Sequence, residues 1–191
     1  TRYETLFPYT TLFRSAFTLD NRPVIASAGY DGTVRVWDPH HPGRLTAEHT
    51  GHTDSVWSVC AFTLDVRFVV ASAGEDGTVR VWDPHHPDRL IAEHTGHTGG
   101  VWCVCASTLD NKPVIASAGA DATVRVWDPH HPDRLIAEHT GHIGGIEGVC
   151  ALTLDNTPVI ASSGDDGTVR VWDPHHPDRL IAEHTGHTGW V

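Results

Sequence analysis

Histidine, serine and aspartate recur together along this chain, and these are the residue types of a hydrolytic triad. In one stretch they are His52, Ser72 and Asp76, and the same types return at regular distances further on. A catalytic nucleophile is normally single and set in a unique pocket. Because the set is repeated, and because a tryptophan such as Trp82 accompanies it each time, we expect a structural network and no enzyme.

Sixteen histidines also raise the question of a metal site. Neutral imidazoles are good ligands for zinc, copper or nickel. Adjacent pairs such as His85-His86, however, lie in a proline-bounded turn, and neighbours in the chain rarely chelate one ion. No carboxylate or thiol spacing completes a site, so we expect no metal and no cofactor. A histidine-rich surface that responds to metal or pH remains the weakest of the alternatives considered for function.

The cysteines do not form a redox or metal motif. Cys103 and Cys105 lie two residues apart, on one face of an expected strand, and Cys60 and Cys150 are isolated. This is neither a Cys-x-x-Cys pair nor a disulfide framework. We therefore expect small buried thiols in a reducing compartment, which favours a cytoplasmic location.

The charge balance narrows the class of partner. Among 191 residues there are 24 acidic and 13 basic ones, of which only Lys112 is a lysine, and the formal net charge is -11. Such a surface repels phosphate backbones, so nucleic-acid binding is not expected. No apolar run approaches the ~18–20 residues of a membrane span, and no secretory leader is recognisable. The absence of methionine leads us to expect a piece of a longer protein.

Two dipeptides define a repeat of 45 residues. Trp-Asp pairs lie at Trp37-Asp38, Trp82-Asp83, Trp127-Asp128 and Trp172-Asp173, and Gly-His pairs lie at Gly51-His52, Gly96-His97, Gly141-His142 and Gly186-His187. The copies are nearly identical. We expect units at about 16–50, 51–95, 96–140 and 141–185, and the start of a further unit at 186–191.

Within each repeat the residue types predict strands and turns. In the second copy the expected strands are Val56–Phe62, Phe68–Ala73, Thr78–Trp82 and Arg89–His94, each rich in β-branched, aromatic or other apolar residues. The Asp-Gly of residues 74–77 favours a tight turn with positive φ, and in the third copy this glycine is an alanine. Four short strands make an antiparallel sheet, and the nearly continuous apolar runs indicate sheets covered on both faces.

The Gly-His, the gap and the Trp-Asp at this period resemble the WD40 repeats of a β-propeller, over residues 16–191. The resemblance implies a polar tetrad in each four-stranded blade. The tetrads are His52, Ser72, Asp76 and Trp82; His97, Ser117, Asp121 and Trp127; and His142, Ser162, Asp166 and Trp172. A relay of this kind would satisfy the indole, hydroxyl, imidazole and carboxylate together. The expected fold is all-β, a partial propeller of four blades that forms part of a larger ring.

The first blade departs from the pattern. It has Ser27, Asp31 and Trp37, but Phe7 stands 45 residues before His52. The segment TLFPYTTLFRS at residues 5–15 resembles a translated sequencing adapter. We therefore interpret residues 1–15 as artefactual, and a natural, divergent end strand is the alternative. The tandem array of near-identical repeats in this chain resembles the WD40 arrays of bacterial, notably actinobacterial, signalling proteins.

The resemblance implies a binding scaffold for a protein or peptide, because the loops at one end of WD40 blades usually hold such partners. The positions there that vary between otherwise constant repeats are Tyr30, Glu75, Ala120, Asp165, Asp54, Trp57, Trp102 and Glu147. Their acidic members favour a basic partner, although unselected drift would leave the same variation. Uncovered blade faces favour self-association, so a structural, oligomer-forming array is the main alternative function.

Overall fold

The structure is a computed structural model that describes residues 14–132 and 134–191. It contains four antiparallel sheets of four strands, and no helix is present among the described residues. The sheets, here called blades one to four, are β1 (Arg14–Leu19), β2 (Arg22–Ala28), β3 (Thr33–Trp37) and β4 (Leu45–Thr50); β5 (Val56–Leu64), β6 (Arg67–Gly74), β7 (Thr78–Trp82) and β8 (Leu90–Thr95); β9 (Val101–Leu109), β10 (Lys112–Gly119), β11 (Thr123–Trp127) and β12 (Leu135–Thr140); and β13 (Ile146–Leu154), β14 (Thr157–Gly164), β15 (Thr168–Trp172) and β16 (Leu180–Thr185). The expected all-β fold is confirmed.

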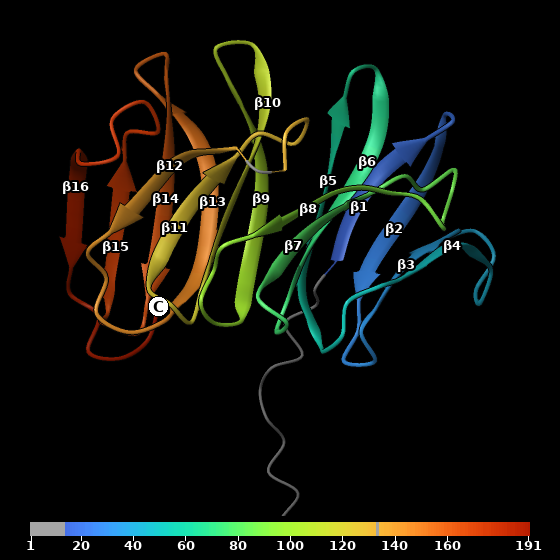
Figure 1. The fold of residues 1–191 in the computed structure, drawn as a ribbon, viewed down its shortest axis with the longest axis horizontal. Helices are drawn as coiled ribbons and strands as arrows, with labels where there is room; N and C mark the ends of the chain where they lie inside the picture. Colours follow the sequence, from blue (N-terminus) through green and yellow to red (C-terminus); the bar gives the residue numbers. More distant parts are fainter. Residues whose placement is uncertain (1–13, 133) are drawn as a thin grey trace, which may run out of the picture.

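The blades stand side by side in chain order, as Figure 1 shows. Within each blade the strands pair in sequence order, and the first strands of successive blades, β1, β5, β9 and β13, contact one another. The last strand of each blade therefore lies farthest from this inner row. Over the described residues the four sheets do not close on themselves, so blades one and four each have one face that no other described blade covers.

The hydrophobic core lies between the blades. Strand β6 is buried continuously from Val69 to Gly74, and β10 is buried in the same way. Since successive side chains of a strand point to opposite faces, such a run needs a neighbour on each side. One core cluster accordingly joins Val79 and Val81 of blade two to Ile115 and Trp127 of blade three.

The strands expected in the second repeat differ from the observed ones by no more than two residues at either end. The largest difference is at the end of β5, which we expected at Phe62 and which continues to Leu64. The connection to β6 is a two-residue turn, Asp65-Val66, with positive φ at both residues. The other repeats place Asn where Val66 stands, and Asn tolerates this conformation far better.

The first fifteen residues, which we interpret as artefactual, lie mostly outside the described part of the chain. Of these fifteen only Arg14 and Ser15 are described, and they pair with Ser27 and Ala26 at the start of β1. Over the described residues, no helix has the length and apolar character needed to cross a membrane.

The turn between the second and third strands uses positive φ in every blade. Gly32, Gly77 and Gly167 have φ between 72° and 77°, and Ala122 occupies the same position with φ 60°. A side chain with a Cβ is strained in this region, by about 1 kcal/mol relative to glycine.

We predict that Ala122→Gly stabilises the protein by about 1 kcal/mol, because it removes this strain. For a chain of this size the melting temperature should rise by roughly 2–4 °C, measured by differential scanning calorimetry. The matched control is Ala120→Gly, two residues earlier in the same turn and without positive φ, which should give no increase. Equal effects of the two changes would contradict the assignment of strain to Ala122.

Candidate functional site

Blade two holds a hydrogen-bonded relay of four side chains. The Trp82 indole donates to Ser72 Oγ at 2.8 Å, and Ser72 Oγ lies 2.8 Å from His52 Nε2. His52 Nδ1 lies 3.0 Å from both carboxylate oxygens of Asp76. Because an ionised carboxylate only accepts hydrogen bonds, Nδ1 carries the proton and Nε2 accepts from the serine hydroxyl.

The structure brings the corresponding residues together in the next two blades. The sets are Trp127, Ser117, His97 and Asp121 in blade three and Trp172, Ser162, His142 and Asp166 in blade four. The relay also has a fifth member that the sequence analysis missed, a threonine such as Thr78, whose hydroxyl donates to the aspartate at 2.8 Å. The fixed Asp-x-Thr spacing of the repeats was the available signal.

The geometry of the relay does not suit catalysis. Ser72 is completely buried, its oxygen already accepts the indole proton, and its own proton is directed to His52. A substrate has no access to such a hydroxyl. The relay instead connects the turn that carries Asp76 to the loop that carries His52 and to the third strand of the blade.

Electrostatics keeps the imidazole neutral and the carboxylate charged. Burial lowers the pKa of His52, and the hydrogen bond with Asp76 offsets only part of that effect. Burial acts to raise the pKa of Asp76, but donation from the Thr53 N–H, from Thr78 and from His52 outweighs it and leaves this pKa below its usual value. The relay is therefore a set of polar groups whose partners lie within the protein.

Blade one contains an incomplete relay. The Trp37 indole donates to Ser27 Oγ at 2.8 Å, whereas Asp31 accepts from Thr33 and Arg35 at 2.6 and 2.8 Å. The position that corresponds to the relay histidine is Phe7, which lies outside the described residues.

A second set of buried histidines connects neighbouring blades. The His49 ring of β4 stacks on Trp82 of blade two with 5.2 Å between centroids, and its Nδ1 lies 3.0 Å from the Pro87 carbonyl oxygen. The corresponding residues at the next two boundaries are His94 and His139, which pack on Trp127 and Trp172. From the sequence we expected no separate role for these histidines. The signal in the sequence was the spacing, since each of these histidines follows a buried alanine by two residues, as His49 follows Ala47. Residues two apart in a strand lie on the same face.

Metal binding finds no geometric support among residues 14–132 and 134–191. No group of three or more histidine, cysteine, aspartate or glutamate side chains is arranged there to hold an ion. Adjacent histidines instead pair with the Asp of each Trp-Asp dipeptide, as His86 does with Asp83 at 3.0 Å.

At the end of the blades that carries the relay, one carboxylate connects two blades. Glu75 Oε2 accepts from the Trp57 indole of its own blade at 2.6 Å and from the Trp102 indole of blade three at 3.3 Å. Tyr30 of blade one packs edge-on against Trp57 with 5.1 Å between ring centroids. Gly100 leaves room for this arrangement, since a Cβ there would collide with the Glu75 carboxylate.

The row continues into blade four with two more acidic residues. Asp165 Oδ2 accepts from the Gly145 N–H at 2.9 Å, and a Cβ on Gly145 would strike the Trp102 ring. The other oxygen of Asp165 is buried and has no hydrogen-bond partner within the described part of the chain. Partial burial and the negative charge of Asp165 raise the pKa of Glu147.

We call this row, formed by Tyr30, Trp57, Glu75, Trp102, Asp165 and Glu147, the acidic–aromatic face. Two further predicted positions lie beside it but make no contact of this kind. Asp54 is exposed and, within the described residues, accepts from the Ser55 N–H alone. Ala120 is an exposed methyl group at the position of blade three that corresponds to Glu75.

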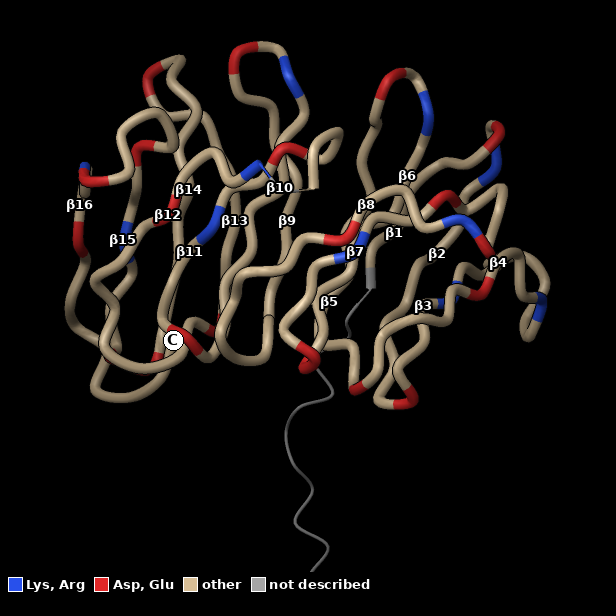
Figure 2. Tube along the Cα trace, viewed as in Figure 1, with Lys and Arg blue, Asp and Glu red and all other residues tan. Residues whose placement is uncertain are grey.

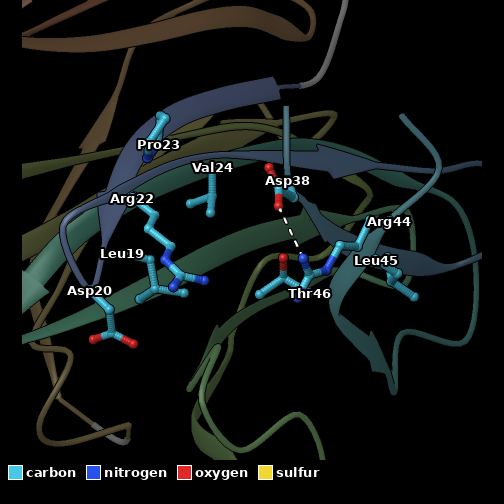
Figure 3. Close-up of a pocket in the computed structure, with 9 residues that line it drawn as sticks. All are labelled: Leu19, Asp20, Arg22, Pro23, Val24, Asp38, Arg44, Leu45 and Thr46. Carbon is cyan, nitrogen blue, oxygen red and sulfur yellow. Dashed lines mark ion pairs between the residues drawn. The ribbon is translucent and has the colours of Figure 1, made fainter. Parts of the chain in front are cut away.

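The loops around this face carry charges of one sign. In Figure 2 this face lies at the lower end of the blades, and the loops there contain acidic segments and no basic ones. The loops at the upper end contain both. A cavity of about 470 Å³ opens at the opposite end of blade one (Figure 3). It is lined by Leu19, Arg22 and Val24 and by the Asp38–Arg44 ion pair of 3.7 Å. Most of these residues recur in the other repeats, so the cavity does not distinguish one blade from another.

We predict that Ser72→Ala costs about 1–3 kcal/mol of unfolding free energy, because it leaves the Trp82 N–H and His52 Nε2 without a partner in a buried site. Urea denaturation measures the change. Ser107→Ala is the matched control, since Ser107 of β9 is half-buried and belongs to no relay, and its loss should be smaller. Equal losses would contradict the relay as the source of the effect.

We predict that the protein loses stability as the pH falls below about 6.5. Burial lowers the pKa of His49 and of His139, and the Pro87 and Pro177 carbonyls offset only part of this. Near pH 6.5 the unfolded chain therefore binds protons at these histidines that the folded chain does not bind. The stability that these neutral histidines contribute is fully present above that pH and is lost as the pH falls. Each such histidine can contribute up to about 1.4 kcal/mol per pH unit.

Thermal unfolding between pH 8 and pH 5 tests this dependence. The His41→Gln variant, which changes an exposed histidine outside the boundaries between blades, should keep the wild-type slope, and His139→Gln should reduce it. An unchanged melting temperature across the range would show that the buried histidines do not govern it.

Comparison with known proteins agrees with the geometry. The WD40 family, described as WD domain, G-beta repeat, matches residues 15–38, 43–83, 88–128 and 133–173. A relative is the ribosome biogenesis protein YTM1 of Yarrowia lipolytica (strain CLIB 122 / E 150), which is 46% identical over 43 residues, 22% of this chain and 8% of that protein. The chain thus spans only a small part of this curated relative. Since the family matches cover most of the chain and the sheets have the expected order, the chain belongs to the WD40-repeat family.

Proposed function

We propose that this chain is a non-enzymatic protein-interaction scaffold whose acidic–aromatic face binds a basic peptide segment. WD40 repeats generally serve as interaction modules, and the membership of this chain supports the general role. The observation that carries the finer proposal is the Glu75 carboxylate, which two indoles from different blades hold in place. Fixed carboxylates beside aromatic rings attract ammonium and guanidinium groups.

The surrounding charges support a basic partner. The loops at this end contain seven acidic residues and no lysine or arginine: Asp31, Asp54, Glu75, Asp76, Asp121, Asp165 and Asp166. Three of them belong to relays, and Glu75 and Asp165 belong to the acidic–aromatic face, which supports a basic partner. The same negative potential disfavours nucleic acid, which the proposal therefore excludes as a ligand.

The wider setting of the scaffold is also a proposal. We place it in a signalling or regulatory protein of a reducing cytoplasm. The support is the thiols of Cys103, which is buried, and of Cys60 and Cys105, which are partly buried; burial raises the pKa of each. Cys150, which we also expected to be buried, is exposed. The similarity to the yeast protein is about one repeat long, so we do not extend ribosome biogenesis to this chain. A second candidate function, an oligomer-forming array, is favoured by the uncovered face of blade four.

We predict that a lysine- and arginine-rich peptide binds this chain and that Glu75→Gln weakens binding about tenfold, a loss of about 1.4 kcal/mol. Glutamine retains the acceptor for the indoles but loses the charge. Isothermal titration calorimetry measures the affinity, and quenching of tryptophan fluorescence reports contact with Trp57 and Trp102. Affinity should fall as salt is added.

The matched control is Asp88→Asn, an equal charge change on an exposed loop at the opposite end of the blades. It should leave affinity unchanged. If both variants weaken binding equally, net charge and not the acidic–aromatic face attracts the peptide. Preference for an acidic peptide would exclude the proposal.

A further inference from the structure

The three boundaries between blades are built from the same contacts. The earlier blade supplies a buried histidine and a glycine, and the later blade supplies a tryptophan, an arginine and a proline carbonyl. At the first boundary His49 stacks on Trp82. A Cβ on Gly51 would lie within 3.1 Å of both the Trp82 ring and the Arg80 guanidinium. The glycines of the other boundaries, Gly96 and Gly141, meet the arginine and tryptophan of the following blade in the same way.

Blade four presents the first half of this boundary, and none of the described residues packs against it. His184 is exposed, although it corresponds to the buried His49, and Gly186 has no atom within 4 Å of its Cβ position. The end of β13 shows the same difference. Leu154 is 44% exposed, whereas its counterparts in the other blades are 5–7% exposed. These counterparts are Leu19, Leu64 and Leu109.

Blade one presents the second half. Trp37 and Ile25 are half-buried, whereas their counterparts in blades two to four are at most 3% exposed. The Asp31 side chain is 51% exposed, against 6–9% for the corresponding relay aspartates. The two uncovered faces are therefore the complementary halves of one boundary.

The end of the chain carries the residue that blade one lacks. In blades two to four the relay histidine comes from a Gly-His pair that follows the preceding blade, such as Gly51-His52 after β4. Gly186-His187 follows β16 in the same way, and His187 is exposed. Blade one has the serine, the aspartate and the tryptophan of a relay, with Phe7 at the histidine position.

Charges at the opposite end of the boundary match as well. Each internal boundary brings a histidine of the later blade near the turn aspartate of the earlier blade, as His130 lies 2.9 Å from Asp65. The other two pairs are His85 with Asp20 at 3.6 Å and His175 with Asp110 at 3.7 Å. Asp155 of blade four and His40 of blade one are the members of this series without a blade opposite them.

We propose that the uncovered face of blade four binds the uncovered face of blade one of a second copy of this chain. His184 then stacks on Trp37 of the second copy, and His187 completes the relay with Ser27 and Asp31 of that copy. Two such contacts join the four described blades of one copy to those of the other in a closed ring of eight, which is within the range of known propellers. The contact is head-to-tail, and it ends growth because the ring closes.

Light scattering after size-exclusion chromatography of the full chain tests the proposal. One chain has a mass of 20.8 kDa, and we expect a particle of twice that mass. Leu154→Arg places a charge in the boundary and should give single chains. Leu90→Arg is the matched control, because leucines at this position are 38–41% exposed in every blade and lie outside the boundaries; it should keep the doubled mass. Circular dichroism checks that each variant retains its sheets.

A variant of the other face distinguishes this contact from its rivals. Ile25→Arg alters blade one alone and should also give single chains. If Leu154→Arg separates the chains and Ile25→Arg does not, blade four binds blade four and the proposal is wrong. A wild-type chain that stays single at all concentrations also overturns the proposal. That result is expected if a different protein covers these two faces. A mass that grows beyond two chains overturns the proposal as well.

Discussion

The structure depends on the need of each sheet for a neighbour on both faces. Strands such as β6 and β10 are buried without alternation, so a single blade would expose apolar side chains on one side or the other. Stacking satisfies this need, and each core cluster draws on adjacent sheets. Hydrophobic burial of this kind is the dominant favourable contribution to folding. Every other feature of the molecule, including the relays and the acidic–aromatic face, is positioned by that stacking.

The relays fix the positions of the loops relative to the stacked sheets. Asp76 accepts from the Thr53 N–H in the loop before β5 and from Thr78 at the start of β7, so one carboxylate links that loop to the turn between β6 and β7. Glu75, the neighbouring residue, is thereby held beside Trp57 and can reach Trp102 of the next blade. A polar network with all its partners rigidifies what it connects. The proposed binding face is therefore pre-organised, which reduces the entropic cost of binding.

Residue types and spacing within one repeat predicted the sheets, and the resemblance to WD40 repeats supplied the residues that the relay brings together. They could not predict what depends on neighbours. His139 and His184 lie in the same six-residue strand sequence, yet one is buried and the other exposed, because only the first has a following blade. The Glu75–Trp102 contact joins two repeats and has no local signal. Val66 at positive φ was missed because a β-branched residue rarely occupies such a turn.

The near-identity of the repeats has a consequence for how the chain reaches this structure. Strands β3, β7, β11 and β15 all read TVRVW, so any of them forms the same local pairs with β2, β6, β10 or β14. The energy of local strand pairing is nearly the same for the correct partner strand and for the equivalent strand of another repeat. Only the short connections, such as the turn from Gly74 to Thr78, favour the proper neighbour by making its encounter fast. Lengthening these turns would therefore promote strand exchange and kinetic trapping.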